Sequence, residues 1–192
     1  MTVGDPAADD VSASLATFRA SDPREEEDLA SIRGVAAGGH PFDRSLRFHL
    51  TASALVIEPE SARVLLRWHT RHDTWMQVGG HGDPVESAPY AVALREAVEE
   101  TGLEDLVSFP DAAAPRLIQV AVVAVRATAK EPAHLHGDLR YVMATSSPDA
   151  IVPESEDNPL RWCTFAEAES LVGEDNLQTL LRRTEELLRQ HL

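Results

Sequence analysis

The sequence predicts an α/β protein in which a mixed β-sheet is covered by helices. Three observations support this class. Segments rich in β-branched and apolar residues outnumber the segments with helical periodicity, the helical segments fall between the strand-like ones, and one strand-like segment is an almost continuous apolar run. Strands interleaved with helices in this way are typical of a sheet that carries helices on its faces.

Residues 1–44 are expected to form an N-terminal extension with one helix. The first part of the extension is small, acidic and proline-containing, which predicts weak order. A helix is expected over residues 22–37, because Ser21 or Asp22 can cap it and Gly38 follows its last apolar residue. We expect this helix either to support a homodimer or to cover an edge of the sheet. The extension carries no convincing motif and is expected to be dispensable for chemistry.

The main domain, residues 45–192, begins with strands. Residues 49–59 and 62–69 are apolar and rich in β-formers, and the short polar stretch between them indicates a hairpin turn. Residues 75–80 form a short strand that runs into a glycine turn. The apolar run over residues 116–127 predicts a central strand buried on both faces.

The second half of the domain is predicted to end in two helices. Strands are expected over residues 138–145 and 160–165. The first helix begins at a possible Thr164 cap, and residues 175–192 carry apolar residues at helical spacing.

The composition limits the classes of function. The chain has 192 residues, which suits one domain with an extension, and its net charge of -15 argues against a nucleic-acid-binding surface. Cys163 is the only cysteine, so neither an intramolecular disulfide nor a cysteine-based zinc site is expected. The sequence shows neither an apolar run of membrane-spanning length nor a signal peptide, and we expect a cytoplasmic protein that does not bind membranes.

An acidic helix is expected over residues 87–101. Ser87 is a plausible cap, Pro89 suits the first turn, and Gly102 is a natural terminator. At about 100° per residue, apolar and charged side chains fall on opposite faces. The apolar face comprises Tyr90, Leu94, Ala97, Val98 and Thr101, and the charged face comprises Arg95, Glu96, Glu99 and Glu100.

The loop before this helix decides between two interpretations of its charges. A charged helix face is most often only solvated. Here, however, the segment GGHGDPVE precedes the helix and adds glycines, two further acids and a tight turn. Carboxylates and backbone carbonyls are the ligands of hard cations such as Mg²⁺, and a bound cation relieves the repulsion among the glutamates.

The stretch from Gly79 to Leu103 resembles the Nudix box, G-x5-E-x7-R-E-U-x-E-E-x-G-U, where U is a bulky aliphatic residue. The helical half matches closely from Arg95 onward, and Gly80 and Glu86 keep the first spacing. Eight residues rather than seven separate Glu86 from Arg95. We expect the helix to begin at or after Ser87, with the surplus residue taken up just before it, because an insertion inside the helix would rotate its faces.

The resemblance covers roughly residues 45–190 and implies a fold and a reaction. Nudix proteins have an α/β/α sandwich, and Nudix hydrolases cleave a diphosphate bond in a nucleoside diphosphate linked to another group. The implied cofactor is Mg²⁺ or Mn²⁺, and the implied partner is a small nucleotide-like diphosphate. Glu99 and Glu100 would bind metal, Glu96 would bind metal or deprotonate the attacking water, Arg95 would hold the glutamates, and the carbonyl of Gly79 or Gly80 would complete the metal shell.

Residues outside the helix are candidates for binding substrate. His81 lies in the box loop, and Arg67 is among the nearby cations able to meet a phosphate. His134 and His136 alternate, so in a strand both point to one side and can contact phosphate or a base. A zinc site is the less favoured interpretation, because no third ligand is evident. Glu156, in an acidic loop before the last strand, is the candidate for an additional acid.

Proteins that resemble the Nudix family can have functions other than hydrolysis. A catalytically silent Nudix-fold protein that senses a nucleotide usually lacks some of the box carboxylates, which are present here. An isomerase of the same fold uses a catalytic cysteine in a local motif that Cys163 does not fit. The proline and tyrosine that mark the family's ADP-ribose and dinucleoside polyphosphate hydrolases are missing from residues 116–123. A nucleoside triphosphate and a nucleotide sugar remain open as substrates.

Overall fold

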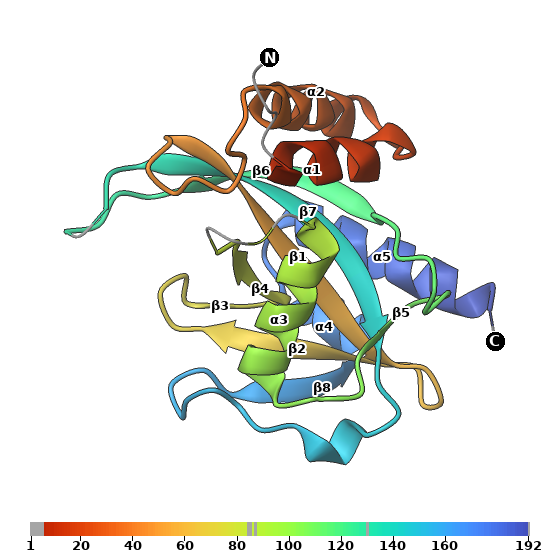
Figure 1. Cartoon of the computed structure of the whole chain (residues 1–192). Coiled ribbons are helices and arrows are strands. Elements are labelled where there is room, and N and C mark those ends of the chain that lie inside the picture. Colours follow the sequence, from red (N-terminus) through yellow and green to blue (C-terminus); the bar gives the residue numbers. More distant parts are fainter. Residues whose placement is uncertain (1–5, 84–85, 87, 130, 192) are drawn as a thin grey trace.

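The computed structural model describes residues 6–83, 86, 88–129 and 131–191. In these residues, eight strands form one mixed sheet with helices around it (Figure 1), which confirms the expected α/β class. No helix within the described ranges is both long and apolar enough to cross a membrane.

Two long strands form the centre of the sheet. β1 (Phe48–Glu58) and β7 (His134–Ala144) pair in parallel over nearly their whole length. On its other side, β1 pairs antiparallel with β4 (Val78–His81) near its start and with β2 (Arg63–His69) at its end. The glycine turn of the box is therefore held directly beside the central strand.

The remaining strands extend this centre. β3 (Thr74–Met76) and β8 (Leu160–Thr164) pair with β2, and β5 (Val107–Ser108) pairs with the end of β7. The single strand expected over residues 75–80 is thus wrong in detail, because β3 pairs with β2 while β4 pairs with β1.

The apolar run expected to be a central strand lies instead at an edge. β6 (Gln119–Val125) pairs with β7 on one side only. Its other side faces α2 (Pro23–Ala37), where Glu25 Oε1 accepts a hydrogen bond from the Val120 amide at 3.2 Å and Asp28 Oδ2 accepts one from the Val122 amide at 3.0 Å. The expectation that this helix covers a sheet edge is confirmed, and a helix rather than a second strand explains the apolar composition of β6.

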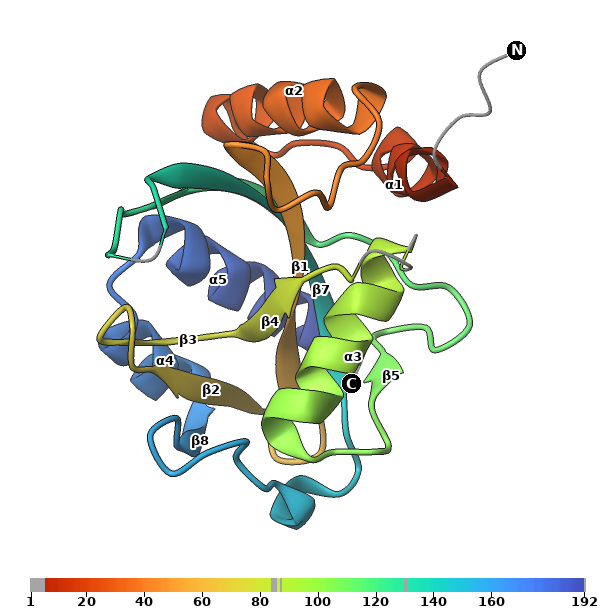
Figure 2. The ribbon, with the colours of Figure 1, turned by 60° about the vertical axis from the view of Figure 1, so that its left-hand side comes forward.

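The N-terminal extension has two helices, not one. α1 (Pro6–Ala16) occupies the region expected to be weakly ordered, and Val11 and Leu15 on it are fully buried in the core. Both helices lie over one end of the sheet (Figures 1 and 2). A short helix of low intrinsic signal is stabilised here by tertiary packing, which local composition does not report.

Alternate residues of β1 face two different halves of the core. Leu50, Ala52 and Ala54 pack on the side of α3 (Pro89–Thr101), whereas Leu55 and Ile57 pack on the side of α4 (Phe165–Leu171) and α5 (Asp175–Arg189). Figure 2 shows α3 and α5 on opposite sides of the central strands. The short 3-10 helix Pro148–Ala150 lies in the connection from β7 to β8.

The acidic helix begins in the segment that is expected to take up the extra residue of the box. Regular helix starts at Pro89, which confirms a start at or after Ser87, although Ser87 itself lies outside the described residues. Ala88 is the N-cap residue and supplies no side-chain cap. Gly102 ends the helix with a φ of 70°, a left-handed conformation that glycine adopts without strain.

Candidate active site

The acidic helix is rotated relative to the expected faces. Val92, Ala93 and Ala97 are fully buried, whereas Leu94 and Val98 are only partly so. The rotation brings Glu100 onto the boundary of the core, where only 9% of it is exposed. The expectation that all three helix glutamates lie off the core face is therefore wrong for Glu100.

Glycines in β4 explain how the helix glutamates approach the sheet. The Gly79 amide donates a hydrogen bond to Glu100 Oε2 at 3.0 Å. The Glu96 carboxylate lies against Gly80, where an added Cβ would stand 2.5 Å from Oε2 of Glu96. A side chain at Gly80 would displace the Glu96 carboxylate, whereas one at Gly79 would collide with Ser53 and Ala52 of β1. Gly80 thus lets Glu96 approach β4, and Gly79 lets β4 lie close against β1.

Arg95 joins three glutamates and the box loop. Its Nη1 donates to Glu96 Oε1 at 2.9 Å and to Glu99 Oε2 at 3.0 Å, and its Nη2 donates to the His81 carbonyl at 2.8 Å. Glu86 receives two parallel hydrogen bonds from the same guanidinium, at 2.8 and 2.9 Å. This pairing lowers the pKa of Glu86 and raises that of Arg95.

Glu100 is the most perturbed of the acids. Burial raises its pKa to about 7, against the opposing effects of Arg67 and the Gly79 amide. Arg67 Nη1 lies 3.3 Å from Glu100 Oε1, and Arg67 Nη2 lies 3.1 Å from Glu154 Oε2. Burial also raises the pKa of Glu96. The nearby arginines therefore do not fully offset the cost of burying Glu96 and Glu100 in their charged forms.

The structure revises two expected substrate contacts. Arg67 is buried and serves as the counterion of Glu100 and Glu154, a geometry that does not favour a free phosphate contact. Glu156 is exposed on its loop. The residue of that loop that contacts the acidic site is Glu154, which accepts a hydrogen bond from Arg67. The sequence of a loop that contains several acids does not indicate which of them contacts the site.

The donor set fits a divalent hard cation. Five carboxylates of the described chain surround the guanidiniums of Arg67 and Arg95, so negative charge is in excess. Glu96 lies against the backbone of Gly80, Glu100 accepts a hydrogen bond from the Gly79 amide, and Glu99 stands between them on the helix. Oxygen donors of this kind are those that Mg²⁺ and Mn²⁺ accept.

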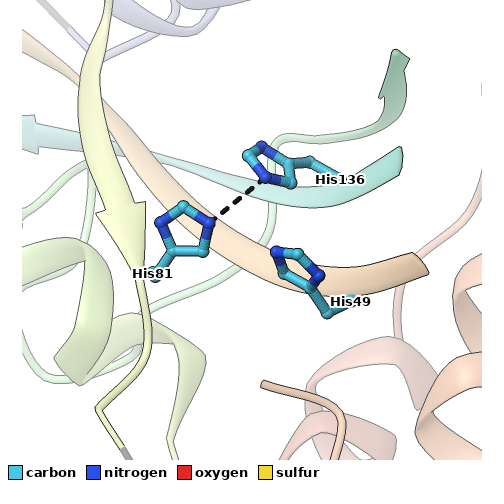
Figure 3. Close-up of side chains that lie close together, drawn as sticks. All are labelled: His49, His81 and His136. Carbon is cyan, nitrogen blue, oxygen red and sulfur yellow. Dashed lines mark hydrogen bonds between the residues drawn. The ribbon is translucent and has the colours of Figure 1, made fainter. Parts of the chain in front are cut away.

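A histidine cluster lies on the other face of the central strands. His49 and His136 are register partners on β1 and β7, and His81 on β4 pairs opposite Thr51, two residues from His49. The Nε2 atoms of His81 and His136 are 3.2 Å apart (Figure 3). Burial lowers the pKa of His81 to about 4 and that of His136 to about 3, so both rings are neutral near pH 7.

A buried polar network adjoins the histidines on the same face. Asp138 accepts hydrogen bonds from Thr51 Oγ1 at 3.0 Å, Ser53 Oγ at 2.8 Å and Arg140 Nε at 2.8 Å. A cleft runs past the two groups, and its lining includes Thr51, Gln77, Gly79, Gly80, His81, His136, Asp138 and Arg140. His81 and His136 are expected substrate contacts, whereas His49, Asp138 and Arg140 are not among the predicted site residues. Their signal lies in the segments HLTASA and HLHGDLR, in which they stand.

Comparison with known proteins identifies the family. The Nudix domain model matches residues 47–183, and no curated protein sequence matches the chain. Among solved structures, the Ap4A hydrolase of Caenorhabditis elegans in a binary complex has a TM-score of 0.58 at 19% identity, over 73% of this chain and 98% of the other.

Two further structures share the fold at similar distance. The dihydroneopterin triphosphate pyrophosphohydrolase of Escherichia coli has a TM-score of 0.52 at 16% identity, over 70% of this chain and 92% of the other. The Nudix domain of Shewanella oneidensis NrtR, complexed with ADP ribose, has a TM-score of 0.51 at 17% identity, over 72% and 87%. With the box carboxylates beside β4 and a family match over most of its length, the chain belongs to the Nudix hydrolase family.

Proposed function

We propose that the protein hydrolyses a phosphoanhydride bond in a nucleoside diphosphate-linked compound of the nucleoside triphosphate or nucleotide-sugar type, with Mg²⁺ or Mn²⁺ held by Glu96, Glu99 and Glu100. The observation that carries the proposal is the surplus of carboxylates around Arg67 and Arg95. A merely solvated helix face would not bury Glu100 against a glycine amide.

The side chains divide the chemical work between them. A bound divalent cation supplies neutralisation of the diphosphate and activation of the attacking water. Glu96, whose pKa is raised by burial, is suited to accept the proton of that water. Arg95 keeps Glu96 and Glu99 adjacent through one guanidinium nitrogen and anchors them to the His81 carbonyl. The carboxylates are therefore positioned before substrate binds, which is how electrostatic stabilisation becomes efficient.

The cleft beside β4 supplies the surface for the substrate. It is lined by backbone of the glycine turn and by the polar face of β1 and β7. The structural neighbours named as acting on Ap4A and on dihydroneopterin triphosphate, and the domain bound to ADP ribose, support a nucleotide-like compound as the substrate class. Their low identity gives no basis for choosing one of these compounds.

A panel assay tests the proposal. Nucleoside triphosphates, oxidised nucleoside triphosphates, nucleotide sugars, ADP-ribose and dinucleoside polyphosphates are incubated with the full chain in Mg²⁺, Mn²⁺ or EDTA, and the products are identified by mass spectrometry. We expect at least one compound to be cleaved only with a divalent cation. Glu99→Gln should reduce the rate of cleavage by on the order of 10²–10³-fold. The matched control Glu169→Gln, at an exposed glutamate on α4, should leave the rate unchanged.

The same panel separates the enzyme from a silent nucleotide-binding protein. Binding of a panel member, measured by calorimetry, without cleavage under any of the metal conditions would overturn the proposed hydrolase and favour the silent alternative.

A further inference from the structure

The three histidines of the cluster come from three strands and converge on one point. His49, His81 and His136 each offer a ring nitrogen, and these atoms all lie within 4.8 Å of one another (Figure 3). Zinc binds imidazole nitrogen at about 2.0–2.1 Å with tetrahedral geometry, which places two ligand nitrogens about 3.3 Å apart. The 3.2 Å between the Nε2 atoms of His81 and His136 matches this spacing. His49 has to move inward to complete the set.

The hydrogen bonding of His49 leaves its inner nitrogen available. Its Nδ1 lies 2.8 Å from the carbonyl oxygen of Leu46, which can only accept, so Nδ1 carries the proton in the neutral ring. Nε2 therefore has a free lone pair. Although only 2% of His49 is exposed, this buried Nε2 has no hydrogen-bond partner among the described residues. Metal-binding histidines are typically oriented in this way, by donation of the other ring N–H to a carbonyl.

His134 repeats the arrangement at the side of the cluster. Its Nδ1 lies 2.9 Å from the Pro132 carbonyl, and its Nε2 lies 3.0 Å from Nε2 of His136. The Nε2 of His136 thus faces two other Nε2 atoms, at 3.0 and 3.2 Å. If the Nε2 of His136 carries a proton, it can donate to only one of these two neighbours. Hydrogen bonds alone therefore leave nitrogen lone pairs of the three rings facing each other. A cation at the centre would satisfy them together.

From this geometry we propose that His49, His81 and His136 form a second metal site, which binds Zn²⁺ and is separate from the carboxylate site. His134 lies beside this set, with its Nε2 3.0 Å from Nε2 of His136. The donors are neutral nitrogens without a carboxylate among them, which favours zinc and related transition ions over Mg²⁺. The two sites share no side chain.

The second site is coupled to the first through β4. The ring of His81 faces the histidine cluster, while its carbonyl accepts a hydrogen bond from Arg95 at 2.8 Å. Gly79, two residues earlier, donates to Glu100. An ion held by the three histidines would fix β4 to β1 and β7 and place a positive charge on the wall of the cleft that His81 and His136 line.

Metal titration of the full chain tests this site without any measurement of turnover. Protein stripped with a chelator is placed in excess Mg²⁺, which occupies the carboxylates, and is titrated with Co²⁺ as a coloured substitute for Zn²⁺. We expect one equivalent to bind with the visible absorption of tetrahedral Co²⁺ and to be displaced by Zn²⁺. X-ray absorption of the zinc-loaded protein should show at least three imidazole ligands.

Single variants assign the ligands. His81→Gln and His136→Gln should each weaken Co²⁺ binding at least tenfold. His69→Gln is the matched control, because its ring lies 4.4 Å from that of His72 in a second pair of adjacent histidines, and it should bind like the unmodified chain. Glu99→Gln should also keep the site. Circular dichroism in chelator shows that each variant is folded, and the two ligand variants provide independent tests.

Three results would overturn the proposal. They are the absence of Co²⁺ or Zn²⁺ binding by the full chain in excess Mg²⁺, equal binding by both folded ligand variants, and loss of the tetrahedral signal in Glu99→Gln. None of these results bears on whether the carboxylate site hydrolyses nucleotides, because the readout is metal binding.

Discussion

Two helices of this protein carry buried acids, and they use them differently. On α2, Glu25 accepts hydrogen bonds from the amides of Ser21 and Val120 and from both terminal nitrogens of Arg183. Asp28 accepts from the Val122 amide and pairs with Arg24 at 3.3 Å. Each of these acids has a cation and a backbone donor, and the cation of Glu25, Arg183, lies farther from its other acid, Asp22, at 3.8 Å.

On α3 the acids share too few cations. Arg95 is divided among Glu86, Glu96 and Glu99, and Arg67 is divided between Glu100 and Glu154. Burial raises the pKa of Glu100 to about 7. A buried acidic helix therefore indicates a metal site when its charges remain uncompensated, not when acids are merely numerous.

The largest effect is expected from the acids of α3. Glu99→Gln and Glu100→Gln should each reduce Mg²⁺-dependent kcat/KM by on the order of 10²–10³-fold, the cost typical of removing one electrostatic contact to the transition state. The melting temperature in EDTA should stay the same or rise, because each variant removes negative charge from an overcharged cluster. Steady-state kinetics and thermal unfolding measure the two quantities. Full activity in both variants would refute the metal assignment.

Glu25→Gln on α2 should show the opposite pattern. It should lower the free energy of unfolding by about 2 kcal/mol, because the new amide N–H₂ group faces donors from Arg183 and Val120. The activity of the folded protein should be unchanged. Urea unfolding beside a kinetic assay tests this, with the exposed neighbour Glu26→Gln as control. A loss of activity at unchanged stability would place α2 in the active site and remove the contrast between the helices.

Glu86→Gln should have a smaller effect than Glu100→Gln. Glu86 is bound by Arg95 rather than placed among the three helix glutamates, so its loss should loosen the positioning of Arg95 and reduce kcat/KM by about tenfold. Both variants are compared at one Mg²⁺ concentration. Equal losses of kcat/KM in the two variants would contradict this prediction. A metal-bound structure with Glu86 as a direct ligand would do the same, because Glu86 would then have the same role as the helix glutamates.

The smallest expected effect is on the pH dependence of stability in EDTA. The folded pKa of Glu100 is raised from 4.5 to about 7, so the folded state binds the extra proton between these values. The stabilisation from this group is fully present below pH 4.5 and is lost as the pH rises through 7. The Glu100→Gln variant should lack this part of the decline. Thermal unfolding between pH 4.5 and 8 measures the difference, and parallel curves would contradict the raised pKa.

Local patterns predicted most of the elements. Asp22 caps α2 and Thr164 caps α4 with a full capping box, as expected from the sequence. Pro89 marks the true start of α3 and Gly102 its end. These signals depend on side chains and backbone groups within a few residues of one another, so a single sequence contains them.

Partners distant in the chain were not predictable in the same way. The apolar run of β6 predicts that this strand is buried, but it does not predict whether a strand or a helix covers its outer edge. In the same way, the sequence of α1 does not show that its stability comes from contacts with the core. Glu100 is buried where it accepts a hydrogen bond from the Gly79 amide, which belongs to a strand outside the helix.

The α/β class, the family and the glutamates and arginine of the box are therefore predictable from one chain, because each depends on residue type and short spacing. Which acids share a cation, and that His49 joins His81 and His136, depends on tertiary contacts. Those three histidines are separated by dozens of residues and meet through the register of β1, β4 and β7. Register is fixed by pairing between strands, and no single strand carries that information.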